Sequence, residues 1–199
     1  MNTISSEFNF NNVGLILEQV EAQNIDILTM NEINVNVKEP KVRTEYMKAV
    51  HKKHHRCAIS ASWAPTTVPA KKYRPGGNQV TIFGRVTHRL KERKFDKIAG
   101  SWAATTIRTN KGQLTIISAY RVCQSSLTQA GPSTVYSQEH IALHANGEEH
   151  PQPRKRWLAE LKRVIEGYCA QGHMILLILM PTNASALEQH FPDSKMTCP

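Results

Sequence analysis

The stretch GHMILLILMPTN, residues 172–183, decides how the fold of this chain is interpreted. Its seven consecutive apolar residues, Met174 to Met180, predict a strand covered on both faces, because a strand with one exposed face alternates apolar and polar residues. In open α/β folds, ligands and metal ions are bound just past the carboxyl ends of strands. A carboxylate at that point would indicate catalysis, but the residues there are Pro181, Thr182 and Asn183.

Upstream of this run, helix and strand patterns alternate. Apolar residues at helical spacing between residues 13 and 20 predict a first helix, which leads into a strand at residues 24–30. Further helices are predicted at residues 39–53, 136–144 and 151–168, and further strands at residues 57–63, 78–86, 101–109 and 113–120.

Two glycine-containing turns connect these elements. Asn110 and Gly112 tolerate positive φ, and apolar residues flank them on both sides, so residues 105–118 are predicted to form a hairpin. Gly76 and Gly77 precede a strand rather than a helix. They are therefore interpreted as a hairpin loop and not as a phosphate cradle.

The length and composition, 199 residues with 40% hydrophobic and 21% charged content, predict one domain with a substantial core. No apolar run reaches the roughly 18 residues that a membrane-spanning helix needs. The polar N-terminal stretch also lacks the apolar segment of a secretory signal. We therefore expect an intracellular protein, nuclear or cytoplasmic, that does not contact a membrane.

The net charge of +9 predicts attraction to polyanions, of which nucleic acid is the most abundant. The excess of Lys and Arg is concentrated in residues 48–56, 71–74, 85–94 and 153–157. Each cluster can also be an ordinary solvated face. The candidate contacts to DNA or RNA are Lys52, Lys53, Arg56, Lys71, Lys72, Arg74 and Arg121.

Two predicted strands are followed directly by residues that could carry chemistry. Glu32 lies just past the strand at residues 24–30, where a carboxylate could hold a divalent cation or could simply cap a loop. Tyr120 and Arg121 end the strand that starts at residue 113. Their phenol and guanidinium could meet a phosphate, or they could be a core tyrosine beside a surface arginine.

The order of five segments resembles the endonuclease/exonuclease/phosphatase superfamily, particularly the endonuclease-like modules of retroelements. These segments are NIDILTMNEIN, YRPGGNQVTIFGRV, AGSWAATTIRTNKGQLTIISAYRVC, PRKRWLAELKRVI and MILLILMPTN. The resemblance implies an α/β fold, a four-layer sandwich in which two mixed β-sheets pack face to face with helices outside. It also implies Mg²⁺-dependent hydrolysis of phosphodiester or phosphomonoester bonds, with a His–Asp pair that orients water.

The resemblance assigns roles to four residues of this chain. Glu32 matches the family's metal-binding glutamate, and Asn2 matches an N-terminal asparagine on the metal side. Tyr120 matches the tyrosine that positions the phosphate, and Asn183 matches the asparagine of a GDxN loop. The aspartate of that loop falls at Pro181, which has neither an acceptor side chain nor a backbone N–H.

The resemblance also places a further aspartate and a final Asp–His pair after the GDxN loop. Only 16 residues follow Asn183, so we expect the family fold to be incomplete at its C-terminus. Residues 1–183 are assigned to the family domain, and residues 184–199 are assigned to a tail that does not match it.

Three functions stay open from the sequence. The chain could be a Mg²⁺-dependent nuclease or phosphatase, although the missing acid predicts impaired catalysis. It could instead be a non-catalytic basic domain that binds nucleic acid. It could also be a relic of a mobile element without a function of its own.

Overall fold

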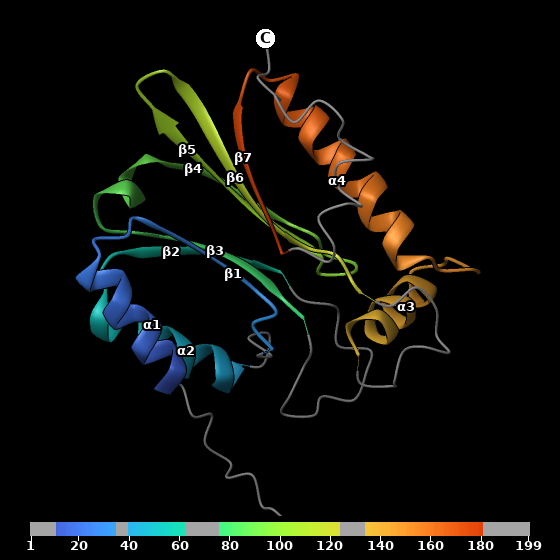
Figure 1. Ribbon diagram of the computed structural model, residues 1–199, viewed down its shortest axis with the longest axis horizontal. Coiled ribbons are helices and arrows are strands. Elements are labelled where there is room, and N and C mark those ends of the chain that lie inside the picture. The colour runs from blue at the N-terminus through green and yellow to red at the C-terminus, as the bar shows by residue number, and fades with distance from the viewer. Residues whose placement is uncertain (1–10, 35–39, 63–75, 124–133, 181–199) are drawn as a thin grey trace, which may run out of the picture.

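In a computed structural model, the residues that the structure describes are 11–34, 40–62, 76–123 and 134–180. They form a three-stranded and a four-stranded β-sheet that pack face to face, with helices on both outer faces (Figure 1). The predicted four-layer α/β class is confirmed. Only the four-stranded sheet is mixed, because the three-stranded sheet is antiparallel throughout.

The three-stranded sheet has the order β1-β3-β2 and carries two helices on its outer face. The strands are β1 (Ile27–Asn31), β2 (Cys57–Ser62) and β3 (Asn78–Phe83), and the helices are α1 (Asn11–Ala22) and α2 (Pro40–Lys53). Each helix turns an apolar stripe to the sheet, since Leu17, Val20, Tyr46 and Val50 are all buried against Phe83.

The four-stranded sheet has the order β4-β5-β6-β7, and only its last pair, β6 and β7, is parallel. The strands are β4 (Leu90–Phe95), β5 (Trp102–Thr109), β6 (Gly112–Tyr120) and β7 (Met174–Met180). Helix α4 (Pro153–Cys169) covers the outer face with Trp157, Leu161, Ile165 and Tyr168. A short 3-10 helix, η1 (Gly84–Arg89), connects the two sheets.

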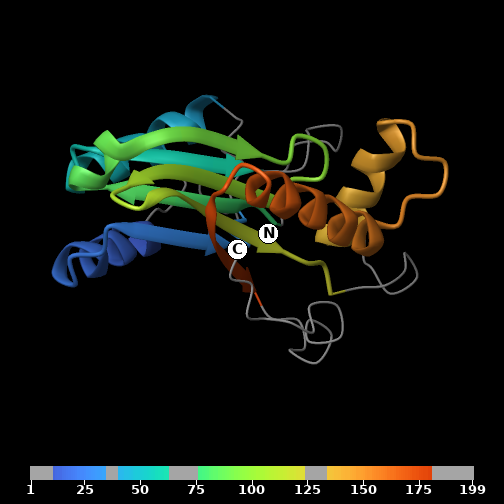
Figure 2. The ribbon, with the colours of Figure 1, turned by 90° about the horizontal axis from the view of Figure 1, so that it is seen from above.

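The core between the sheets is apolar with a few paired hydroxyls. Val80 and Ile82 of β3 pack against Ile107 of β5 and Ile116 of β6. Burial of a side chain of this size contributes about 1.5–3 kcal/mol to folding. The outlying helix α3 (Val135–Ala145) lies past the end of the sheets and beside the start of α4 (Figure 2).

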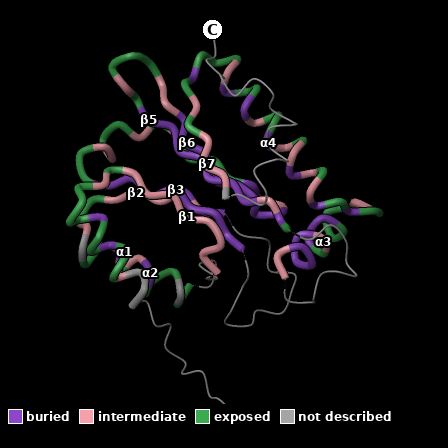
Figure 3. Tube along the Cα trace, viewed as in Figure 1, coloured by how far each residue is buried: buried purple, intermediate pink, exposed green. Residues whose placement is uncertain are grey.

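The strand of residues 174–180 forms as predicted, but it is not covered on both faces. Its odd-numbered residues, such as Leu177, pack against α4, and Ile178 joins the core between the sheets. Met174 and Leu176 are 42% and 46% exposed. The reason is position: β7 is the last strand of its sheet among the described residues, so its first half is covered on one side only (Figure 3).

Two further predictions are modified by the structure. Strand β4 was not predicted, because its sequence LKERKF looks like a solvated charge cluster; it is an edge strand, where charged side chains are common. The hairpin of β5 and β6 is confirmed, with Thr109 opposite Gly112. Gly112 has φ +130°, whereas Asn110 does not adopt positive φ.

None of the helices in the described ranges is both long and apolar enough to cross a bilayer.

Candidate functional site

The carboxyl ends of β1 and β6 meet, although the two strands belong to different sheets. The hydroxyl of Ser118 in β6 donates a hydrogen bond to Oδ1 of Asn31 at 2.7 Å. The same hydroxyl lies 3.4 Å from the carbonyl oxygen of Met30. Glu32, which follows β1, and Tyr120, the last residue of β6, are therefore held at the same edge of the sandwich.

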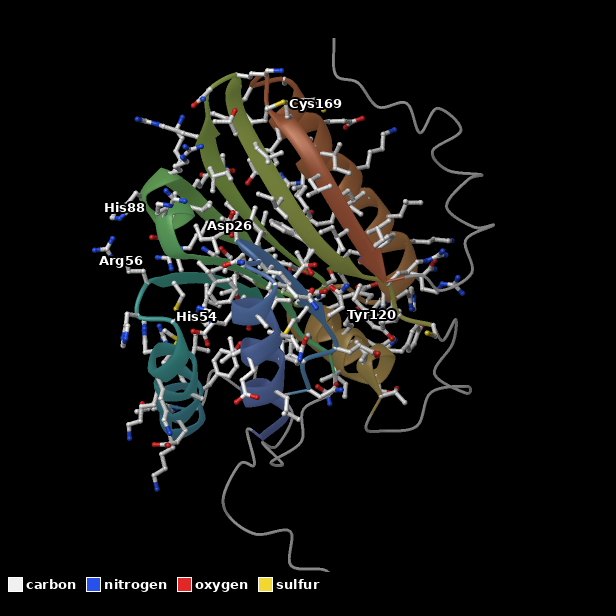
Figure 4. The ribbon with its side chains drawn as sticks, turned by 60° about the vertical axis from the view of Figure 1, so that its left-hand side comes forward. Asp26, His54, Arg56, His88, Tyr120 and Cys169 are labelled. Atoms are coloured by element: carbon white, nitrogen blue, oxygen red, sulfur yellow. The ribbon has the colours of Figure 1, made fainter. Side chains whose placement is uncertain are left out.

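The phenol of Tyr120 is the buried centre of this site, with 6% of the residue exposed (Figure 4). Burial raises its pKa, and so do the neighbouring Glu32 carboxylate and Cys123 thiol. The Cys123 sulfur lies 3.7 Å from the phenol oxygen. Tyr120 consequently remains a protonated hydrogen-bond donor at neutral pH, next to a carboxylate.

The backbone of Glu32 is in the left-handed region, with φ +51°, and Asn34 has φ +57°. A non-glycine residue in this region costs of order 1–3 kcal/mol, so surrounding contacts must hold it. Those contacts come from two glycines. The N–H of Asn34 donates to the carbonyl of Gly76 at 2.9 Å, and the N–H of Ile33 donates to that of Gly77 at 3.4 Å.

The Gly76–Gly77 segment supports the loop that carries Glu32, whereas the sequence indicates only a hairpin loop. Its own N–H at Gly76 donates to Oδ1 of Asn34 at 3.0 Å, which closes the contact from the other side. Both glycines have φ above +90°. A Cβ at Gly76 would lie 3.3 Å from Cγ1 of Val135, so the first residue of α3 also restricts this position.

Arg121 and Arg154 bring positive charge to the edge of the sandwich at which β6 ends. Arg121 follows Tyr120 directly, and Arg154 is in the first turn of α4. The pKa of Arg121 is lowered by burial and, to a lesser degree, by the charge of Arg154. Arg121 was predicted from its place after a strand. Arg154 lies in the predicted basic cluster of residues 153–157 but was not among the candidate contacts, because only the tertiary structure brings the start of α4 to the end of β6.

A buried acidic pair lies behind the site. Glu139 of α3 is 2% exposed, and its pKa is raised well above the usual value by burial and by Asp96, with Arg156 opposing. Asp96 accepts hydrogen bonds from the N–H groups of Ile98, Ala99 and Ser101 at 2.9–3.2 Å. Asp96 is therefore fully used in shaping a turn. The burial of Asp96 and Glu139 could not be predicted from the sequence, because nothing in their neighbouring residues distinguishes them from exposed acids.

The basic cluster around Lys52 and Arg56 is not part of this site. Both residues are exposed, and Arg56 Nη1 lies 3.0 Å from Nε2 of His88. Cys57 pairs with Phe83 at one end of the sheet, whereas Asn31 pairs with Asn78 at the other. Five residues at about 3.3 Å each separate these ends by about 17 Å. In Figure 4, Arg56 and Tyr120 lie far apart.

The remaining predicted residues lie outside the described parts of the chain. These are Asn2, Lys71, Lys72, Arg74, Asn183 and the side chain of Lys53. Pro181 also lies outside them. Met180, which pairs with Tyr120, is the last residue described before Pro181 and Asn183.

The site offers a metal ion one carboxylate, that of Glu32. Within the described ranges, no three or more His, Cys, Asp or Glu side chains gather in a way that could hold a metal ion. Mg²⁺ does not need such a cage, since one or two carboxylates, several waters and substrate phosphates commonly bind it. The single carboxylate of Glu32 therefore fits a metal site that waters and a substrate phosphate would complete.

The comparisons with known proteins give a limited likeness. No family model and no curated protein matches the chain. Among solved structures, it is similar to an endonuclease/exonuclease/phosphatase family protein from Leptotrichia buccalis C-1013-b, with 14% identity and a TM-score of 0.38. The alignment covers 74% of this chain and 61% of that protein. Function is therefore inferred from the residues of the site and not from this likeness.

Proposed function

We propose that the chain forms an endonuclease/exonuclease/phosphatase-like domain that binds a phosphate ester of nucleic acid at the Glu32–Tyr120 site. One observation carries the proposal. The carboxylate of Glu32, which follows β1, lies close enough to the phenol of Tyr120, the last residue of β6, to raise the pKa of that phenol, and the two strands belong to different sheets. The motif order that resembles this family assigns a metal ligand and a phosphate-positioning group to these same two residues.

The chemistry follows from the two side chains. Glu32 would hold a divalent cation, Mg²⁺ by resemblance, and the ion would supply positive charge to the phosphate oxygens. Tyr120 has one O–H proton, which would turn from Glu32 to the phosphate once the cation binds the Glu32 carboxylate. Asn183 and Asn2 are proposed as further contacts on the phosphate and metal sides, respectively.

Turnover at this site is proposed to be impaired. The resemblance places Pro181 where the family has an aspartate, and proline offers no side-chain acceptor to orient a water molecule. Loss of one general acid–base group typically lowers a rate by about two to four orders of magnitude. The protein therefore binds its phosphate ester much better than it hydrolyses it.

A second candidate function is that of a non-catalytic domain that binds nucleic acid through its basic surface. It is favoured by the net charge of +9 and by exposed cations such as Lys52 and Arg56, which lie away from the site. Lys53, Lys71, Lys72, Arg74 and Arg121 are proposed to contribute to the same attraction. We also propose that the chain derives from a mobile element. It could then be a relic that has no function of its own.

A cleavage assay combined with a gel-shift assay tests the proposed function. The wild-type chain and Glu32→Ala are incubated with DNA or RNA, with Mg²⁺ or Mn²⁺. We expect the wild type to form a complex and to release no more product than Glu32→Ala. Metal-dependent cleavage that Glu32→Ala abolishes would show that catalysis is intact. Absence of a complex with either nucleic acid would refute the binding function.

The domain is proposed to comprise residues 1–183, with residues 184–199 outside it. Deletion of residues 184–199 is then expected to leave the midpoint of urea unfolding unchanged, because those residues would bury little apolar surface. A clear fall in the midpoint would place part of this segment within the domain.

A further inference from the structure

Within the described residues, two arginines at the end of β6 and the start of α4 each have an Nε atom that lacks an acceptor. The Nε atoms of Arg121 and Arg154 are both buried, and neither has a hydrogen-bond partner among the residues that the structure describes. In the parts of the chain that the structure describes, neither guanidinium forms an ion pair with an acidic side chain. Buried polar groups in folded proteins normally have a partner, so this pair indicates that an acceptor is missing.

The two guanidiniums are also close to each other. Arg121 follows the end of β6 and Arg154 is in the first turn of α4, and these ends adjoin in Figures 1 and 4. Their proximity is reflected in the lowered pKa of Arg121, to which burial contributes most and Arg154 contributes next. Two like charges repel each other, and an anion between them would turn this repulsion into attraction.

Other arginines of α4 have the partners that Arg154 lacks. Nε of Arg156 lies 2.9 Å from Oε1 of Glu148, and Nη2 of Arg163 lies 2.8 Å from Oε1 of Glu160. Glu148, the acid paired nearest to the start of α4, is therefore already engaged by Arg156. The lack of an acidic partner is therefore specific to the position of Arg154 and does not apply to the other arginines of α4.

We propose that Arg121 and Arg154 together bind one phosphodiester group of a nucleic-acid strand, at the edge of the sandwich where β6 ends. A guanidinium presents two parallel N–H donors to phosphate oxygens, which makes arginine suited to this ligand. Arg154 is also near the N-terminus of α4, where Gln152 makes no side-chain cap, so the helix dipole favours the same anion.

This clamp would act as a positioning device. A phosphate held by both arginines fixes the strand at the edge of the sandwich that also carries Glu32, and therefore sets which other phosphate of the strand reaches Glu32. The identity of the ligand as nucleic acid rests on the proposed function. The anion site itself rests only on the two arginines and needs no metal ion.

Binding of a ten-nucleotide DNA oligomer without terminal phosphates, measured by fluorescence anisotropy in EDTA, tests the clamp. Arg121→Met and Arg154→Met keep most of the apolar stem and remove the charge. Each is expected to weaken binding at least about tenfold, as for loss of a hydrogen bond to a charged group. Lys155→Met is the matched control, because Lys155 is exposed and adjacent and the charge change is the same. It should change affinity less than about twofold, as one screened charge does.

Two further measurements keep the outcome clear. Thermal unfolding without ligand shows whether each variant folds, and Arg154→Lys, which keeps the charge but loses the fork, is expected to bind more weakly than the wild type. Unchanged affinity in both arginine-to-methionine variants, or an equal loss in Lys155→Met, would overturn the clamp. Stabilisation by inorganic phosphate without binding of the oligomer would show that the site takes a free or terminal phosphate, which would contradict the diester assignment.

The two proposals can fail separately. Because the oligomer is bound in EDTA, a metal site that proves absent leaves the expected loss in Arg154→Met unaltered. Conversely, a normal metal response in Glu32→Ala together with a loss in Arg154→Met would refute the role of Glu32 and support the clamp.

Discussion

At the scale of single residues, the site depends on Glu32, whose backbone adopts a left-handed conformation that residues with a Cβ atom disfavour. Glu32 has φ +51°, and the hydrogen bonds of Ile33 and Asn34 to Gly77 and Gly76 hold the segment there. Strain of this kind persists only where the surrounding structure fixes it, and it is found often at functional sites. A carboxylate directed at Tyr120 is a reason for the chain to carry this strain.

Replacement of Glu32 separates the strain from the function. Glycine adopts positive φ without a steric cost, whereas alanine does not, and the difference is about 1–2 kcal/mol. We expect Glu32→Gly to unfold at a higher urea concentration than Glu32→Ala, although both lose the carboxylate. The free energies of unfolding of the two variants would be equal if the backbone at this position were unstrained in solution.

Tyr46 gives a prediction for alkaline pH. Burial raises its pKa to about 12, although the hydrogen bond from Nε2 of Gln79, at 2.6 Å, lowers it. An unfolded tyrosine has a pKa of about 10. The folded state therefore favours the neutral phenol. The stability that this contributes is complete below pH 10 and is lost as the pH rises from 10 to 12.

The corresponding measurement is the free energy of unfolding between pH 9 and 12. In Tyr46→Phe, the fall across the window from pH 10 to 12 should be shallower than in the wild type, by up to about 1.4 kcal/mol per pH unit. The comparison of slopes, rather than of absolute stabilities, removes the constant effect of the lost hydrogen bond to Gln79. Parallel curves would contradict the raised pKa.

At the scale of elements, helix α4 stabilises the four-stranded sheet through a stripe that the sequence already revealed. Leu161 lies in the middle of this stripe and is fully buried. Leu161→Ala is expected to lower the free energy of unfolding by about 2–5 kcal/mol, because it removes transfer energy and leaves a cavity. Lys162→Ala, on the exposed face, should change it by no more than about 0.5 kcal/mol. Equal effects of the two changes would mean that α4 does not dock on the sheet.

Apolar periodicity predicts the elements that have a buried face. The stripe of α4 and the β-branched strands β5 and β6 are therefore visible in the sequence, whereas β4 is not. The charged residues of β4 suit an edge strand, but a solvated loop or helix face would have the same residues, so the sequence does not distinguish them. The exposure of the first half of β7 could not be predicted either, because an apolar run does not indicate whether another strand lies next to it.

The site divides in the same way. Glu32, Tyr120 and Arg121 could be proposed because each follows a strand, and strand ends are where sites form. Arg154 and the pair Gly76–Gly77 could not. Their roles arise from contacts between segments that are distant in the sequence, and only the packing of α4 and β3 brings them there.

At the scale of the whole molecule, the cations divide into those near the site and those at the far end of the first sheet. Arg56 is about 17 Å, or five strand residues, from the end that carries Glu32. A four-nucleotide oligomer bound at the site would not reach Arg56, whereas a duplex of twenty base pairs could contact both regions.

The dependence of affinity on salt can distinguish these regions. Each phosphate contact on duplex DNA contributes about −0.9 to the slope of log affinity against log salt concentration. The triple change Lys52→Ala, Lys53→Ala and Arg56→Ala should flatten the slope for the long duplex and leave the slope for the four-nucleotide oligomer unaltered. An unaltered slope for the duplex would make these residues solubilising charge only.

The central claim is that Glu32 holds a metal ion together with a bound phosphate. The affinity for Mn²⁺, followed by the electron paramagnetic resonance signal of the free ion, tests it most directly with and without the ten-nucleotide oligomer. We predict that the oligomer raises the affinity for Mn²⁺ at least about fivefold, that Mn²⁺ raises the affinity for the oligomer by the same factor, and that Glu32→Ala abolishes both effects. Affinity for Mn²⁺ that ignores the oligomer, or coupling that survives in Glu32→Ala, would contradict the claim.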